Sequence, residues 1–226
     1  MGGSIARRLI ARIPVLNRIK SRLKNASIRK SGERRLKELG KRPPIRIVIG
    51  ASGICDEGWI ETDIEYLNLL NPKHWETYFQ KDSIDAILAE HVWEHLTPEQ
   101  GLAAARKCFE YLRPGGYLRV AVPDGFFPDP KYIEYVRPGG SGAGADDHKV
   151  LYDHITFSEL FTKAGFRVEP LEYHDSKGVF HFVEWKTADG TIFRSKRFDD
   201  RNTDVKLGYT SVILDAYKPY ANGATI

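Results

Sequence analysis

The chain has 226 residues, of which 42% are hydrophobic and 12% aromatic, so it is long enough to bury one substantial core. No apolar run approaches the roughly 18 residues of a membrane-spanning helix, and the N-terminus mixes apolar residues with arginines, unlike a signal peptide. Cys55 and Cys108 are too few for a disulfide framework or a four-cysteine zinc site. We therefore expect a cytoplasmic body with two reduced thiols.

The charge is divided unevenly along the chain. Residues 1–44 hold 14 Lys or Arg against two Glu, a local charge of +12, so the net charge of +4 leaves −8 for the remainder. Apolar residues recur there every three or four positions, which predicts an amphipathic helix. They are Ile5, Leu9, Ile13, Leu16, Ile19 and Leu23. Such a helix either lies on an anionic surface at the inner face of the membrane or packs on the body; nucleic acid is a weaker alternative as partner.

Residues 45–226 form the second expected domain, in which strands and helices alternate. Strands are predicted at 45–49, 59–64, 84–89, 117–122, 166–168 and 210–216. Capping-box patterns at 97–100 and 156–159 predict the starts of two helices. This rhythm is typical of an α/β fold, a Rossmann-like parallel sheet with covering helices.

Two further segments are expected to interrupt this rhythm. Residues 180–185 and 191–198 are predicted to pair as a β-hairpin around the turn at 188–190. Residues 138–145 contain four glycines, which predicts a mobile loop that serves as a lid.

The first strand ends in Gly50-Ala51-Ser52-Gly53, a turn of small residues that lets the backbone approach a ligand. Asp63 ends the next predicted strand, where a carboxylate can accept hydrogen bonds from the hydroxyls of a ribose. Only nine residues separate Gly53 from Asp63, too few for a full crossover helix. The usual phosphate-binding helix N-terminus is therefore missing, which disfavours NAD and FAD and favours a nucleoside cofactor without phosphate.

The segment Glu90-His91-Val92-Trp93-Glu94-His95-Leu96 has two interpretations. It matches the His-x-x-Glu-His zinc pattern of inverted zinc peptidases, but that pattern requires His91 and His95 on one helix. A strand precedes the segment and the helix start is signalled at Thr97, so we expect a strand-to-helix loop at the carboxyl edge of the sheet, where ligands bind.

These motifs together resemble the class I S-adenosylmethionine-dependent methyltransferases, in particular small bacterial ones. The resemblance covers residues 45–220 and rests on the segments 47–53, 58–63, 90–96 and 112–118. It implies a seven-stranded, mostly parallel sheet with helices on both faces, and S-adenosylmethionine as cofactor. It also implies that residues 50–53 lie under the methionine part, that Asp63 binds the ribose, and that Glu90 and His91 lie beside the sulfonium.

The acceptor side is predicted from chain order. Asp124, after a central strand, and His148, beyond the glycine-rich segment, are the candidate catalytic bases. We expect O- or N-methylation of a small-molecule or glycan acceptor and no bound metal. Two alternatives stay open: a zinc-dependent hydrolase using His91, Glu94 and His95, and a noncatalytic cofactor-binding module.

Overall fold

The computed structural model describes residues 30–51 and 55–220. Within them, seven strands form one sheet. The strands are β1 (Arg46–Ile49), β2 (Ile60–Glu61), β3 (Ile84–Glu90), β4 (Leu112–Pro123), β5 (Arg167–His174), β6 (Phe180–Phe182) and β7 (Ser211–Tyr217). The α-helices with defined bounds are α2 (Pro72–Tyr78), α3 (Pro98–Tyr111), α4 (Pro130–Val136) and α5 (His154–Lys163). Short 3-10 turns lie at Trp93–His95, Ala145–Asp147 and Thr187–Asp189.

The strand order is β2-β1-β3-β4-β7-β5-β6. The pairings of β1 with β2, β1 with β3 and β3 with β4 are parallel, whereas β4 with β7, β7 with β5 and β5 with β6 are antiparallel. The expected seven-stranded α/β sheet is confirmed. The expectation of a mostly parallel sheet is not confirmed, because three of the six strand pairings are antiparallel. Two of these involve β7, which lies between β4 and β5.

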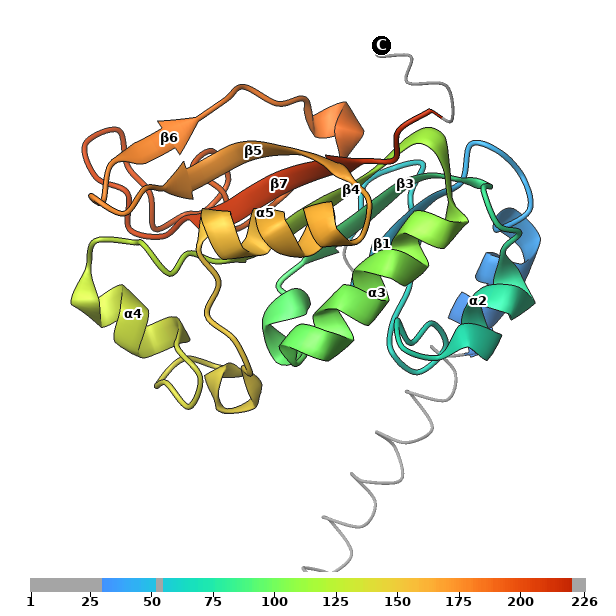
Figure 1. Ribbon diagram of the computed structural model, residues 1–226, viewed down its shortest axis with the longest axis horizontal. Helices are drawn as coiled ribbons and strands as arrows, with labels where there is room; N and C mark the ends of the chain where they lie inside the picture. Colours follow the sequence, from blue (N-terminus) through green and yellow to red (C-terminus); the bar gives the residue numbers. More distant parts are fainter. Residues whose placement is uncertain (1–29, 52–54, 221–226) are drawn as a thin grey trace, which may run out of the picture.

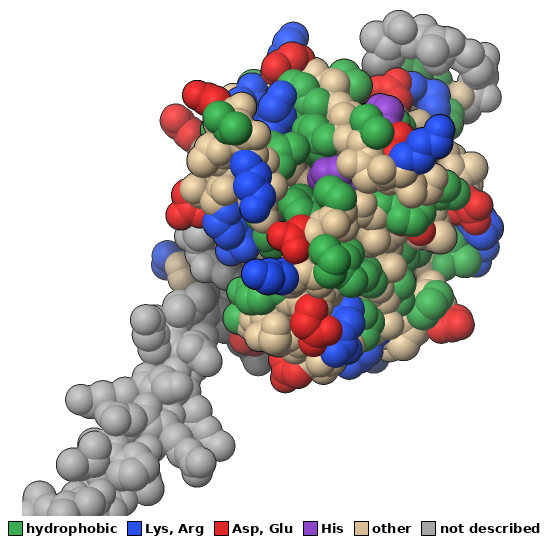
Figure 2. Space-filling view, turned by 90° about the vertical axis from the view of Figure 1, so that its left-hand side faces the viewer, with side chains coloured by type: hydrophobic (Ala, Val, Ile, Leu, Met, Phe, Trp, Pro, Cys, Tyr) green, Lys and Arg blue, Asp and Glu red, His purple; other side chains and the backbone are tan. Residues whose placement is uncertain are grey.

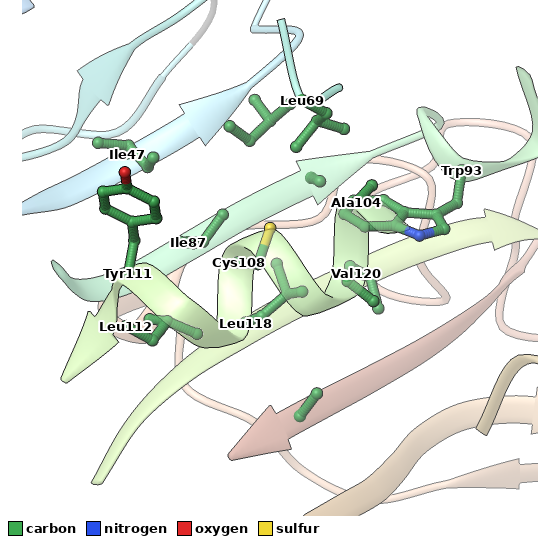
Figure 3. Close-up of a cluster of buried hydrophobic side chains, with 14 of the residues drawn as sticks. Ile47, Leu69, Ile87, Trp93, Ala104, Cys108, Tyr111, Leu112, Leu118 and Val120 are labelled. Atoms are coloured by element: carbon green, nitrogen blue, oxygen red, sulfur yellow. The ribbon is translucent and has the colours of Figure 1, made fainter. Parts of the chain in front are cut away.

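Helices α2, α3 and α5 cover one face of the sheet (Figure 1). Alternate strand residues point to this face, as the period of two in a strand requires, and they pack against the apolar sides of the helices. The largest core forms here (Figure 3). Its members include Ile47, Ile87, Leu118 and Val120 from the strands and Ala104, Cys108 and Tyr111 from α3.

The other face has no α-helix packed on it among the described residues, so the expectation of helices on both faces is wrong. We call residues 183–200 the cover segment, because its side chains Trp185 and Ile192 pack on this face with Val48 and Leu88. The predicted hairpin is also wrong. β6 pairs instead with β5, and residues 191–198 form no strand.

Helix starts follow local capping rules. Thr97 caps α3 with the predicted capping box, since its hydroxyl accepts from the Gln100 N–H and the Gln100 side chain accepts from the Thr97 N–H. Helix α5 begins earlier than predicted, because Asp153 and not Thr156 is its N-cap. The two residues form a capping box, in which the Asp153 side chain accepts the Thr156 N–H and the Thr156 side chain accepts the Asp153 N–H. Helices α2 and α4 were not expected, although Asn71 and Asp129 cap them.

The N-terminal extension joins the body before residue 45. Residues 30–39 are helical, and Leu36 is completely buried in the main core. The predicted amphipathic stretch from Ile5 to Leu23 lies outside the described residues. Among the residues that are described, no helix is both long and apolar enough to cross a membrane.

Candidate functional site

The sheet order makes the edge between β1 and β3 the candidate ligand site. The chain leaves β1 for β2 on one side and later returns to β3 on the other side, so the carboxyl ends of β1 and β3 form a topological switch point. The described part of the β1–β2 connection, residues 50–51 and 55–59, contains no helix, as the short spacing predicts. The backbone of this edge is fixed by hydrogen bonds from the Thr62 N–H to the Val48 carbonyl and from the Ala51 N–H to the Thr62 carbonyl.

A cavity of about 530 Å³ lies at this switch point, within the range of small-molecule sites. It brings together four of the predicted cofactor residues, Gly50, Ala51, Glu90 and His91. Gly50 has φ +66°, and a Cβ there would lie 3.1 Å from Val92 Cγ2. Both the left-handed conformation and the close approach favour glycine at this position.

The other predicted cofactor residues are not part of this lining. Ser52 and Gly53 lie outside the described residues. Asp63 does not line the cavity: its Oδ1 accepts the Ile64 N–H at 2.7 Å and closes a local turn. Burial, together with the neighbouring Glu65, raises the pKa of the Asp63 carboxyl. The ribose contact of Asp63 stays a prediction.

Glu90 holds one wall of the cavity in place. Its carboxylate oxygens accept the backbone N–H groups of Phe193 (3.0 Å) and Arg194 (2.5 Å). Asp56, from the β1–β2 connection, accepts the Thr191 N–H at 2.9 Å. Two carboxylates from opposite sides of the switch point therefore anchor the cover segment over the cavity. Charge-assisted hydrogen bonds of this kind contribute about 1.5–3 kcal/mol each.

His91 links the end of β3 to the sheet interior. It has φ +53°, and its N–H donates to the Ala121 carbonyl at 2.9 Å, which extends the pairing of β3 with β4. In its side chain, Nε2 lies 3.2 Å from Ser211 Oγ and Nδ1 lies 3.0 Å from Glu94 Oε1. The imidazole is about a quarter exposed and forms part of the cavity wall.

The segment that follows is a loop, as expected. Residues Trp93–His95 form one 3-10 turn, and α3 begins only at Pro98. His91 and His95 therefore do not lie on one α-helix, and the arrangement of an inverted zinc peptidase is not formed. The group of potential metal ligands among the described residues is a different one, Glu94, His95 and His148.

The two predicted catalytic bases lie in different environments. Asp124 is completely buried, and its Oδ2 accepts from both the backbone N–H (2.7 Å) and the Nδ1 of His174 (2.9 Å). Its Oδ1 accepts the Phe126 N–H, so the carboxylate stabilises the turn after β4 and does not reach the cavity. Asp124 in this environment is a structural carboxylate.

His148 lies in a second cavity of about 130 Å³. This cavity adjoins the first, because His91 and Arg194 line both. Tyr135 and Tyr209 supply aromatic walls. The glycine-rich segment contributes residues 142, 143 and 145 and folds back on α4 through backbone hydrogen bonds, such as that from the Gly142 N–H to the Tyr135 carbonyl. Its predicted role as a lid stays a prediction.

Part of the larger cavity could not be found from sequence motifs. The cover segment supplies Phe193, Arg194, Asp199 and Asp200. Asp199 is buried and pairs with Arg194 and Arg201, which together with its backbone hydrogen bond keep its pKa low in spite of burial. These residues form no spacing pattern, and only their place in the fold brings them to the switch point.

The chain is similar to known proteins in its fold and not in its sequence. No protein-family model matches the chain, and no curated protein matches. Among solved structures, the chain is similar to an S-adenosylmethionine-dependent methyltransferase from Archaeoglobus fulgidus, with 17% identity, a TM-score of 0.43, and coverage of 84% of this chain and 94% of that one. It is also similar to one from Thermotoga maritima, with 15% identity, a TM-score of 0.46, and coverage of 90% and 95%.

Proposed function

We propose that the chain transfers a methyl group from S-adenosylmethionine to an acceptor. The observation that carries this proposal is the cavity at the carboxyl ends of β1 and β3. Gly50 lines it in a left-handed turn, and the described part of the β1–β2 connection contains no helix whose N-terminus could bind a phosphate. A nucleoside cofactor without phosphate needs no such helix and can lie close to the backbone at Gly50. The sequence motifs and the sheet order point to the same pocket independently.

The charge of the cavity supports a cationic cofactor. Its described lining includes the four carboxylates of Asp56, Glu90, Asp199 and Asp200, and the one guanidinium of Arg194. S-adenosylmethionine carries a sulfonium and an ammonium group against one carboxylate, so its net charge is positive. A cleft lined mainly by one sign of charge attracts a ligand of the opposite sign.

The cofactor supplies an activated methyl group, and the protein has to align the acceptor with it and exclude water. The cover segment closes one side of the cavity through its hydrogen bonds to Glu90 and Asp56. His91 stands between the two cavities, and we assign the smaller one to the acceptor. Its tyrosine walls and the guanidinium of Arg201 suit a small polar or glycan acceptor, methylated at oxygen or nitrogen.

Calorimetric titration of the full chain with S-adenosylmethionine tests the cofactor. We expect one site per chain, and absence of binding at high micromolar protein would overturn the proposal. Gly50→Ala is expected to weaken binding, because the added methyl group contacts Val92 and strains the turn. Gly58→Ala is the matched control: Gly58 has φ +82°, but nothing lies within 4 Å of its added Cβ and it does not line the cavity.

Turnover separates an enzyme from a noncatalytic cofactor-binding module. The full chain is incubated with methyl-labelled S-adenosylmethionine and metabolite or glycan fractions of a cell extract, and the products are identified by mass spectrometry. Labelled product that depends on the chain supports the enzyme. Tight cofactor binding with no labelled product in any fraction favours the binding module.

For the basic N-terminal extension we propose peripheral attachment to an anionic membrane surface. On the side of the molecule drawn in Figure 2, basic and acidic side chains of the body alternate, so this face offers no extended basic surface to nucleic acid. Because residues 30–39 pack on the body, the test truncation removes residues 1–29 only. The full chain is expected to float with anionic liposomes, and equal flotation of the truncated chain would overturn the proposal.

A further inference from the structure

We propose that Glu94, His95 and His148 bind a divalent transition-metal ion, for which zinc is the best match. One potential ligand atom from each of these residues lies within 4.8 Å of the other two. Two imidazoles and one carboxylate are a known three-residue zinc set, which leaves a fourth position open. This inference does not require the proposed methyl transfer, although His148 also lines the cavity that we assign to the acceptor.

Glu94 is the first observation that points to a ligand. Its side chain is 1% exposed, and neither carboxylate oxygen has a hydrogen-bond partner within the described chain. His91 Nδ1 lies 3.0 Å from Oε1, but the pair does not meet the geometry of a hydrogen bond. A buried carboxylate without hydrogen bonds is costly, and buried charges in proteins are paired or coordinate metals. A cation between Glu94 and the two histidines removes this cost.

The second observation is the orientation of the two imidazoles. His148 Nδ1 lies 2.7 Å from the Val136 carbonyl oxygen, so it carries the proton and leaves Nε2 as the free nitrogen. His95 Nδ1 lies 3.3 Å from Asp147 Oδ2, which likewise leaves Nε2 free. A histidine that ligates a metal typically donates its other ring nitrogen to a carbonyl or a carboxylate in this way.

The backbone brings the three residues together across more than 50 positions of the chain. The N–H groups of Lys149 and Val150 both point to the Glu94 carbonyl, at 2.7 and 3.3 Å, and so hold His148 beside the 3-10 turn of residues 93–95. The rings of His95 and His148 then meet edge to face, with centroids 4.8 Å apart.

The distances are compatible with a bound ion after small rotations of the side chains. Tetrahedral zinc with ligand bonds of 2.0–2.2 Å separates its ligand atoms by about 3.4 Å. The separations of up to 4.8 Å therefore have to shorten by at most about 1.4 Å. His95 is about one-third exposed, so it can make this adjustment. A histidine bound to metal cannot accept a proton, so this proposal assigns His148 the role of ligand instead of catalytic base.

The test uses the untagged full chain, dialysed to equilibrium against zinc and analysed for metal per chain. We expect one zinc ion per chain and at least about a 100-fold weaker affinity in His148→Ala and in Glu94→Gln, because each removes a ligand. Asp147→Asn, which keeps all three ligands but weakens the partner of His95 and the ion pair with Lys149, is expected to weaken binding about 10-fold. His181→Ala removes a partly exposed histidine elsewhere in the fold and should leave affinity unchanged.

Thermal unfolding gives a second readout that does not depend on activity. Free zinc at 100 times its Kd is expected to raise the Tm of the wild-type chain by about 5–10 °C. The Tm of His95→Asn, a substitution at a partly exposed position, should stay unchanged by zinc. Absence of stoichiometric zinc in the wild-type chain, or equal affinity in His148→Ala and in the wild type, would overturn the proposal.

Discussion

Arg119 is the residue on which the cover segment depends most, and we expect Arg119→Met to destabilise the protein strongly. Arg119 is 1% exposed, and its guanidinium forms two parallel hydrogen bonds of 2.8 Å with the Asp215 carboxylate. Its remaining nitrogen donates to the carbonyls of Lys186 (3.2 Å) and Gly190 (2.8 Å), and the group lies over the Trp185 ring. One side chain therefore joins two sheet strands to the segment that covers them.

The magnitude follows from what the substitution leaves behind. Burial alone would lower the pKa of Arg119, but the Asp215 carboxylate outweighs this effect and the pKa is raised. Without the guanidinium, Asp215 is a buried charge whose nearest side-chain donor is the Tyr217 hydroxyl at 3.2 Å. Removing one partner of a buried pair costs about 3–5 kcal/mol. The Gly190 carbonyl also loses its donor and adds to this cost, whereas the Lys186 carbonyl still accepts the Asp189 N–H.

Urea unfolding of the full chain measures the effect, with the slope m expected to stay constant. The double variant Arg119→Met/Asp215→Leu should recover most of the loss, because it replaces the ion pair with apolar side chains. Arg113→Met is the surface control. Arg113 pairs with Asp85 at 2.7 Å but is 44% exposed, so we expect a change of about 0–1 kcal/mol. A loss below about 1 kcal/mol for Arg119→Met, or a double variant no more stable than the single one, would refute the reasoning.

Three further predictions concern the cavity and the titration of the body. Glu90→Gln neutralises one of three carboxylates that accept backbone N–H groups of the cover segment, and should raise the Kd for S-adenosylmethionine about tenfold or more in calorimetry; an unchanged Kd would contradict it. Cys55 lines the cavity, so the cofactor should slow its alkylation, whereas Cys108 is fully buried, has a pKa raised by burial, and should not react with or without cofactor. Hydrogen bonds from His181 and the Val179 N–H lower the pKa of Asp175 to about 2. Its stabilising contribution is thus present above the ordinary pKa of about 3.9 and lost as the pH falls through 2, and an NMR titration midpoint near 4 would contradict it.

The sequence predicts best those parts of the fold whose partners are close along the chain. The capping box at Thr97 predicts the start of α3 because both of its hydrogen bonds are made within four residues. The spacing of Gly53 and Asp63 alone predicts that no helix follows β1, and the described part of that connection contains none. Helices α2 and α4 carried comparable signals, Asn71 and Asp129 each followed by proline at the first helical position, but each helix has only seven residues and little periodicity.

The cover segment shows why other parts could not be predicted. Residues 191–198 include the β-branched and aromatic types Thr191, Ile192, Phe193 and Phe198 that favour a strand, yet their backbone N–H groups bond to carboxylate side chains. The Thr191 N–H bonds to Asp56, those of Phe193 and Arg194 to Glu90, and that of Lys196 to Glu172. Carboxylate side chains replace the neighbouring strand as acceptors, and only the three-dimensional fold brings them there.

The loop after β3 explains why one short motif serves two places in the fold. Glu90 and His91 end the strand and line the larger cavity, whereas Glu94 and His95, one 3-10 turn later, lie beside His148. The change of direction occurs at His91, whose left-handed backbone costs roughly 1–2 kcal/mol in a residue with a Cβ. That conformation is maintained because the His91 N–H bonds to the Ala121 carbonyl while its ring faces Ser211. The strain at this one residue therefore separates the proposed cofactor contacts from the proposed metal ligands by a single turn of chain.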